Sequence, residues 1–93
     1  MKVSDTGTTF VLREDDGVAE LRYRLEGDRL VLEHTEVPEE LGGRGIGSAL
    51  VKAAVERARA DGFGLLVECQ FASAWLRRHV DDVADLSIEY APT

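Results

Sequence analysis

The stretch LGGRGIGSAL, residues 41–50, places four glycines directly before a helical pattern. Glycine lets the backbone turn sharply and lets another molecule approach the main chain closely. The first N–H groups of a helix have no intrahelical acceptor and lie at the positive end of the helix dipole. This stretch therefore favours a site for a phosphate or pyrophosphate. The alternative is a tight strand-to-helix turn, for which one glycine would be enough.

Two common nucleotide loops do not fit this spacing. A Walker-type loop ends in Gly-Lys followed by Ser or Thr, whereas here Gly47, Ser48 and Ala49 follow one another without a lysine. A dinucleotide fingerprint needs glycine where Ser48 stands, and the chain beyond it is too short for a doubly wound domain. Both interpretations are excluded.

The residues before the loop alternate between apolar and polar side chains, as half-buried strands do. We expect strands over residues 8–13, 18–25 and 29–37. Asp16 and Gly17 form a hairpin-turn signal, Gly27 marks a second turn, and Pro38 ends the third strand. The N-terminal half is predicted to be an antiparallel meander.

After the loop the apolar period changes to that of a helix from residue 46, and Gly62 can end this helix in the left-handed conformation. Residues 63–69 form the next predicted strand, so strand, helix and strand make a βαβ crossover. Residues 71–80 predict a short helix, and residues 86–90 either a last strand or a loosely packed tail. The side chains expected to point inward from the short helix are Trp75, Leu76, His79 and Val80. The predicted fold class is α/β (α+β), a mostly antiparallel sheet with one βαβ crossover and helices packed on it.

Composition limits the size and the partners of this fold. The chain has 93 residues, 44% of them hydrophobic, which suits one domain over residues 1–93. A net charge of −7 disfavours nucleic acid and anionic membranes as partners. An acidic surface suits amine-bearing substrates, although it also serves solubility alone.

Cysteine, histidine and terminal patterns add further expectations. Cys69 is the only cysteine, so an intramolecular disulfide is excluded. His34 and His79 lie far apart in sequence and show no metal-ligand spacing with Cys69, so we expect no metal site. The first residues lack the apolar stretch of a signal peptide, and no segment reaches the length of a membrane span. We therefore expect a cytoplasmic location.

Gly45 and Gly47 occupy the two small positions of a known loop pattern: Arg or Gln, two residues, Gly, one residue, then Gly or Ala. In this pattern the segment resembles the coenzyme A pyrophosphate loop of the GNAT acetyltransferase superfamily. Gly42 stands where that superfamily has Arg or Gln, which removes a side-chain contact, and Arg44 can partly replace the lost charge. Residues 34–41, 69–71 and 75–79 resemble the small YjdJ-type subfamily, and the resemblance extends over about residues 30–86.

The resemblance implies a compact GNAT-like fold and an N-acetyltransferase that uses acetyl-CoA as cosubstrate. The acceptor would be a primary amine of a small molecule or protein. The cosubstrate would lie between the strand before the loop and the strand after the helix. The residues that the resemblance assigns to coenzyme A are Val37, Gly42, Gly43, Arg44, Gly45, Ile46, Gly47 and Ser48. The hydroxyl of Ser48 is either a phosphate ligand or an ordinary polar group of the first helical turn.

Acetyl transfer needs a neutral amine, donors for the oxyanion and a proton for the departing thiolate. Cys69 stands where many members of the subfamily carry a cysteine; it can carry the acetyl group, protonate the thiolate, or merely pack as a small hydrophobe. His34 and Glu36 alternate onto one face of their strand and can accept a proton from the amine. Their simpler interpretation is a hydrogen-bonded strand histidine and a strand-end carboxylate.

Two further alternatives concern the whole chain and the last helix. Arg77 and Arg78 suit the negative end of a helix without any function, although arginine there can also contact phosphate. The rival to an enzyme is a noncatalytic acyl-CoA-binding or protein-interaction module, because so short a chain lacks extra elements to build an acceptor pocket.

Overall fold

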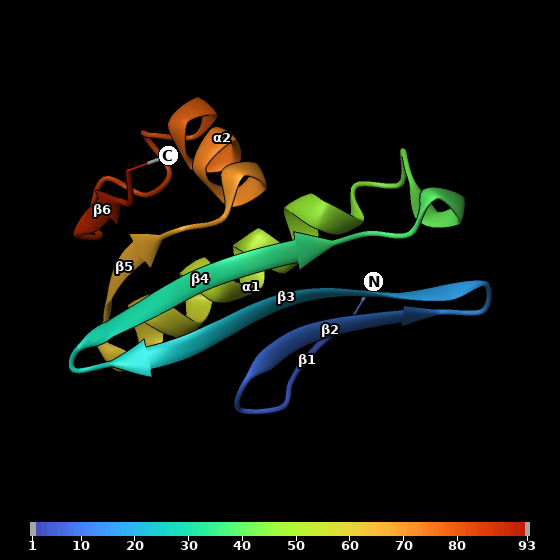
Figure 1. Ribbon diagram of the computed structural model, residues 1–93. Helices are drawn as coiled ribbons and strands as arrows, with labels where there is room; N and C mark the ends of the chain where they lie inside the picture. The colour runs from blue at the N-terminus through green and yellow to red at the C-terminus, as the bar shows by residue number, and fades with distance from the viewer. Residues whose placement is uncertain (1, 93) are drawn as a thin grey trace.

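The computed structural model describes residues 2–92 and contains one six-stranded sheet in the order β1-β2-β3-β4-β5-β6 (Figure 1). The strands are β1 Val3–Asp5, β2 Thr9–Glu14, β3 Gly17–Glu26, β4 Arg29–Glu36, β5 Gly64–Val67 and β6 Ile88–Tyr90. The helices are the 3-10 turn η1 Glu39–Leu41, α1 Ile46–Asp61 and α2 Gln70–Arg78.

Strands β1 to β4 form the antiparallel meander that the sequence predicts. The β2–β3 hairpin closes at Glu14 opposite Gly17, and the β3–β4 hairpin closes at Glu26 opposite Arg29. Strand β1, antiparallel to β2, is an addition, because three residues are too few to show an alternating pattern.

The second half contains the predicted crossover. Strands β4 and β5 pair in parallel from Arg29 opposite Gly64 to Leu32 opposite Val67, and α1 connects them. Of the two alternatives for the tail, a strand is formed, because β6 pairs in parallel with β5. The predicted fold class is confirmed, although β5, α2 and β6 make a second βαβ crossover, whereas the sequence predicts only one.

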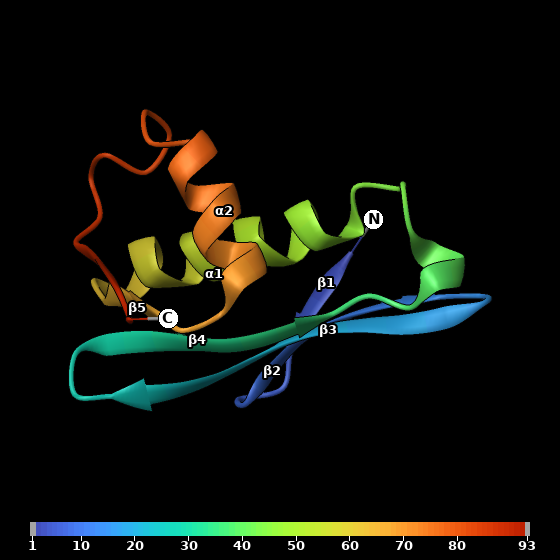
Figure 2. The ribbon, with the colours of Figure 1, turned by 45° about the horizontal axis from the view of Figure 1, so that its top comes forward.

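Both helices cover the same face of the sheet (Figure 2). Apolar side chains of α1, such as Leu50 and Val51, are buried against this face, as are Trp75 and Leu76 of α2. The prediction that Val80 points inward is wrong, because α2 ends at Arg78 and Val80 is 57% exposed. His79 is half-buried and stacks on Trp75.

Strand β4 contains a β-bulge that changes which side chains face the helices. Tyr23 of β3 pairs with Leu32, but the preceding Arg22 pairs with His34, so Glu33 is one residue too many. A bulge of this kind re-aims the side chains beyond it. Beyond the bulge, Thr35 lies opposite the buried Leu21 and faces the helices.

Residues 2–92 contain neither a membrane-spanning helix nor a metal-binding cluster. Between residues 2 and 92, no helix combines the length and apolar character needed to cross a bilayer. Over the same range, no group of three His, Cys, Asp or Glu side chains is arranged to hold a metal ion.

Candidate active site

The glycine loop connects η1 to α1 at the end of β4. Gly43 and Gly45 have φ angles of 78° and 75°, in the left-handed region that glycine adopts without strain. A Cβ added at either residue would meet no atom within 4 Å, so the backbone conformation rather than crowding requires glycine there. Gly45 is the residue before α1, and no side chain of residues 2–92 caps this end of the helix.

The main-chain N–H groups of residues 43–48 have no acceptor among the described residues. The first hydrogen bond of α1 runs from the Ala49 amide to the Gly45 carbonyl, at 3.1 Å. The loop borders an open cavity of about 460 Å³, which we call the loop cavity. A run of free donors beside a concavity fits an oxyanion ligand such as a diphosphate.

Most of the residues predicted to bind coenzyme A line the loop cavity. Its lining includes Val37 at the end of β4, all four glycines of the loop, Ile46 and Ser48, together with Phe71 and Arg78 of α2. Ser48 Oγ accepts a hydrogen bond of 3.0 Å from Trp75 Nε1, which leaves the hydroxyl hydrogen of Ser48 available to a ligand. This bond also connects the first turn of α1 to α2.

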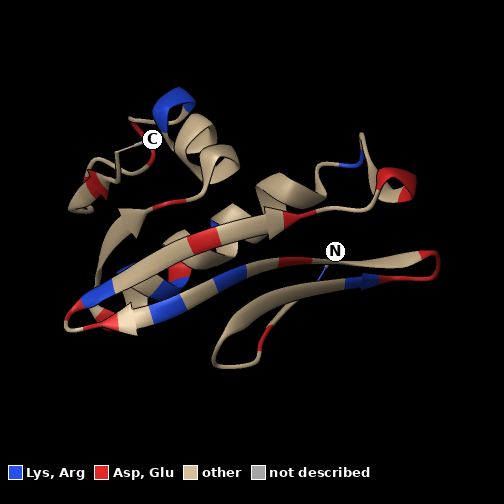
Figure 3. Cartoon of the chain, viewed as in Figure 1, with Lys and Arg blue, Asp and Glu red and all other residues tan. Residues whose placement is uncertain are grey.

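The side chain of Arg44 lies outside the loop cavity. Its guanidinium holds Asp16 at the tip of the β2–β3 hairpin through bonds of 2.8 and 3.2 Å, and it also donates to the Glu40 carbonyl. The hydrogen bonds from Arg44 lower the pKa of Asp16. Figure 3 shows why this partner is available, since the hairpin tip beside the loop is acidic. The guanidinium therefore does not replace the charge that Gly42 removes from the pattern.

A second cavity of about 330 Å³, the thiol cavity, opens where β4 and β5 separate. Their pairing ends at Leu32, whose carbonyl accepts the amides of both Glu68 and Cys69, at 2.9 and 3.1 Å. Strand β4 continues to Glu36 without a partner from β5. This separation exposes one edge of β4 beside the thiol.

Cys69 is the residue before α2, and its Sγ accepts a hydrogen bond from the Ala72 amide. Thr35 Oγ1 lies 3.0 Å from Sγ, and either atom can be the donor. Cys69 is 5% exposed, yet it belongs to the lining of the thiol cavity. The sulfur therefore has polar contacts with Thr35 and with the first turn of α2.

His34 lines the thiol cavity, whereas Glu36 does not. Both residues are exposed and lie on the sheet face away from the helices, opposite Arg22 and Glu20 respectively. His34 and Glu36 share one face of β4, as predicted. Because of the bulge, Thr35 lies on the opposite face, where it contacts Cys69.

Two carboxylates at the rim of the thiol cavity are held by one arginine. Arg24 binds Glu33 at 2.8 Å and Glu68 at 3.2 Å, and these hydrogen bonds raise the pKa of its guanidinium above the ordinary value. These carboxylates therefore have a cationic partner already.

Phe71 lies between the two cavities and belongs to the lining of both. Its ring lies so close to Gly47 that a Cβ added there would be 2.5 Å from Phe71 Cζ. A ligand reaching from the loop to Cys69 must therefore pass this ring.

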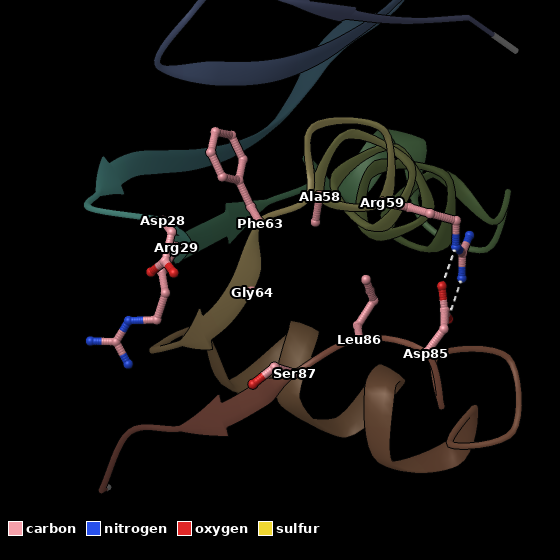
Figure 4. A pocket seen from close by; sticks show the side chains of 10 residues that line it. Asp28, Arg29, Ala58, Arg59, Phe63, Gly64, Asp85, Leu86 and Ser87 are labelled. Atoms are coloured by element: carbon pink, nitrogen blue, oxygen red, sulfur yellow. Dashed lines mark hydrogen bonds and ion pairs between the residues drawn. The ribbon is translucent and has the colours of Figure 1, made fainter.

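Another cavity, of about 410 Å³, lies at the opposite ends of β4 and β5 (Figure 4). Both arginines of its lining are engaged: Arg59 binds Asp85 at 2.8 Å and Arg29 binds Glu89 of β6 at 2.6 Å. In open α/β sheets, ligands bind at the carboxyl ends of the strands, where the glycine loop and Cys69 lie. We therefore place the candidate site there.

Sequence reasoning did not identify Thr35 or Phe71 as site residues. Thr35 lies between the two candidate bases, and only the bulge makes it the neighbour of the thiol. Phe71 follows Cys69 by two residues, which was a usable signal, because the first turn of a helix lies beside its cap residue.

Two similarities to known proteins accompany this geometry. A family model described as GCN5-related N-acetyl-transferase matches residues 9–86. The NMR solution structure of a protein from Staphylococcus aureus, described as "a GCN5-like putative N-acetyltransferase", superposes with a TM-score of 0.73. It is 29% identical in sequence, over 99% of this chain and 89% of that one. No curated protein sequence matches the chain significantly. With the family model matching most of its length, the chain belongs to the GCN5-related N-acetyltransferase family.

Proposed function

We propose that this protein is an N-acetyltransferase that transfers the acetyl group of acetyl-CoA to a primary amine of a small molecule or protein. The observation that carries the proposal is the run of unpaired main-chain N–H groups at residues 43–48 beside a cavity. Enzymes of this family generally use acetyl-CoA. Within the family, we assign the chain to the small YjdJ-type subfamily as one domain over residues 1–93.

The coenzyme would be held mainly by the backbone of the loop. Residues 43–48 offer their amides to the diphosphate, whereas Gly42 lines the cavity but its amide already donates to the Glu39 carbonyl at 3.0 Å. Arg44 takes part through its main chain, because its side chain is bound to Asp16. Ser48 can add its hydroxyl hydrogen, and Val37 forms an apolar wall next to the loop. From there the arm of the coenzyme would run past Phe71 to the gap between β4 and β5.

The thioester supplies an activated acetyl group, and the chain has to supply donors and a proton path. Main-chain groups on the free edge of β4 would stabilise the oxyanion, since that edge has no partner strand beyond Leu32. In direct transfer, the amine nitrogen bonds to the acetyl carbon, the carbon–sulfur bond of the thioester breaks, and the Cys69 thiol gives a proton to the departing coenzyme A thiolate. Alternatively, the Cys69 sulfur bonds to the acetyl carbon, the bond from that carbon to coenzyme A breaks, and the thiol proton goes to the coenzyme A thiolate. The amine then attacks the new thioester and releases the Cys69 thiolate.

The proton of the amine would pass to His34 or Glu36. His34 is the better placed of the two, because it lines the thiol cavity and Glu36 lies two residues farther along the strand. Thr35 would orient the thiol, because its hydroxyl contacts Sγ on the other side of the strand.

The proposal is tested with purified protein, acetyl-CoA and a panel of primary amines. We expect amine-dependent release of free coenzyme A thiol and formation of the acetylated amine. The intact mass of the protein, after rapid quenching without amine, separates the two routes, since only the covalent one adds an acetyl group to Cys69. Coenzyme binding without turnover on any amine would instead indicate a noncatalytic acyl-CoA-binding module, and no binding would indicate an interaction domain without this ligand.

A further inference from the structure

We infer that Arg78 is the cationic ligand of the coenzyme diphosphate and takes the place of the basic residue that the glycine loop lacks at Gly42. The inference rests on the proposed function, because it names a side chain for the same cavity. It concerns α2 rather than the loop itself, since α2 forms the opposite wall.

A full positive charge in the loop cavity would strengthen the binding of a diphosphate. The main-chain amides of residues 43–48 supply donors and the partial charge of a helix end, but no formal charge. The protein carries a net charge of −7, and Glu39 lines the same cavity. Among the described residues that line this cavity, Arg78 alone carries a cationic side chain.

The other nearby arginines are already engaged. Arg44 is bound to Asp16, and Arg77 lies 3.9 Å over the ring of Tyr90 and donates to Ser73. Arg77 also lines a different cavity, on the other side of α2. Among residues 2–92, by contrast, no carboxylate forms an ion pair with Arg78, which is exposed.

The position of Arg78 relative to the loop is fixed by the fold. The Trp75 indole donates to Ser48 in the first turn of α1, and Phe71 packs on Gly47, so α2 is attached to the loop at two points. Arg78 is in the last turn of α2, one turn beyond Trp75, which directs its guanidinium to the mouth of the same cavity. A guanidinium there can bind phosphate oxygens with two parallel N–H bonds.

The test measures binding by calorimetry, with coenzyme A and with dephospho-coenzyme A, which lacks the 3′-phosphate but keeps the diphosphate. We expect Arg78→Gln to weaken the binding of both ligands about tenfold, as the loss of a charge-assisted hydrogen bond does. The matched control Arg77→Gln should leave both affinities within about twofold, because its guanidinium lies on Tyr90. Arg78→Lys should recover part of the loss, because it keeps the charge without the fork.

The outcomes separate this inference from the proposed function. Unchanged affinity of Arg78→Gln, in a protein whose wild type binds coenzyme A, overturns the role of Arg78 alone. A loss confined to coenzyme A, with dephospho-coenzyme A unaffected, also overturns it, since Arg78 would then contact the 3′-phosphate. Failure of the wild type to bind either ligand overturns the proposed function and this inference together.

Discussion

The loop cavity and the thiol cavity adjoin at Phe71, but they are built in different ways. The loop cavity is made mainly of main-chain groups, whose positions follow from glycines and the start of a helix. The thiol cavity depends on side chains, whose direction follows from one bulge and one helix cap. We infer that binding of the coenzyme depends on the main chain of the loop and on Arg78 and tolerates other side-chain changes around the loop, whereas chemistry depends on a few atoms around Cys69.

The strongest way to test this contrast is to replace Cys69. We expect Cys69→Ala and Cys69→Ser both to lower kcat by about a hundredfold or more, because either route of transfer uses the thiol. The KM for acetyl-CoA should change by less than about threefold, because the loop is untouched. Steady-state kinetics of both variants provides the measurement.

The serine variant is the control for a purely structural role of Cys69. Serine can still cap α2 through the Ala72 amide and bond to Thr35, whereas alanine loses both contacts. If the serine variant kept full kcat and only the alanine variant were impaired, the sulfur would be a helix cap and not a reacting group.

The second test is a pair of substitutions with equal backbone strain. Gly45 and Gly62 flank α1 and have φ angles of 75° and 71°, so Gly45→Val and Gly62→Val should each reduce stability by at least about 1–2 kcal/mol. Only Gly45→Val should weaken the binding of coenzyme A, by about thirtyfold, because it displaces the free amides and places a side chain in the open space of the loop. Thermal melts and titrations give the two readouts.

If both variants bound coenzyme A with the affinity of the wild type, the loop amides would not hold the ligand. If both lost binding equally, the loss would follow from stability rather than from the loop. Either result removes the contrast between the two cavities.

Most of the fold follows from periodicity in the sequence. Alternation in the meander and the helical period after residue 46 are averages over many residues, so they survive exceptions at single positions. The glycine loop could be identified for the same reason, since it brings several glycines together at a helix start. The prediction failed at Val80, because α2 ends at Arg78 and the helical period no longer determines which way a later side chain points.

The arrangement around the thiol could not be obtained in this way. One additional residue, Glu33, changes the face on which Thr35 lies, and no local pattern marks such an insertion. Periodicity likewise does not predict the contacts of the loop with distant residues. Phe71 contacts Gly47 and Asp16 binds Arg44 only because the tertiary fold brings these segments together. The sequence can therefore predict which residue types form the site, but their positions depend on tertiary contacts that no sequence pattern shows.

The smallest effect is expected at Arg44, the cation inside the loop sequence. We expect Arg44→Gln to change the affinity for coenzyme A by less than about twofold, because its guanidinium is bound to Asp16 and stays outside the loop cavity. The same substitution should raise the pKa of Asp16 toward the ordinary value of about 3.9, since hydrogen bonds from Arg44 lower it in the wild type. Titration of the Asp16 carboxyl by NMR measures this shift.

The pH dependence of stability follows from linkage: the Arg44–Asp16 pair stabilises the fold above the pKa of an unfolded aspartate, and the contribution disappears as the pH falls through the lower native value. A large loss of affinity in Arg44→Gln would mean that the guanidinium leaves the hairpin when the coenzyme binds, and that the side chain of Arg44 as well as the main chain holds the diphosphate at the loop.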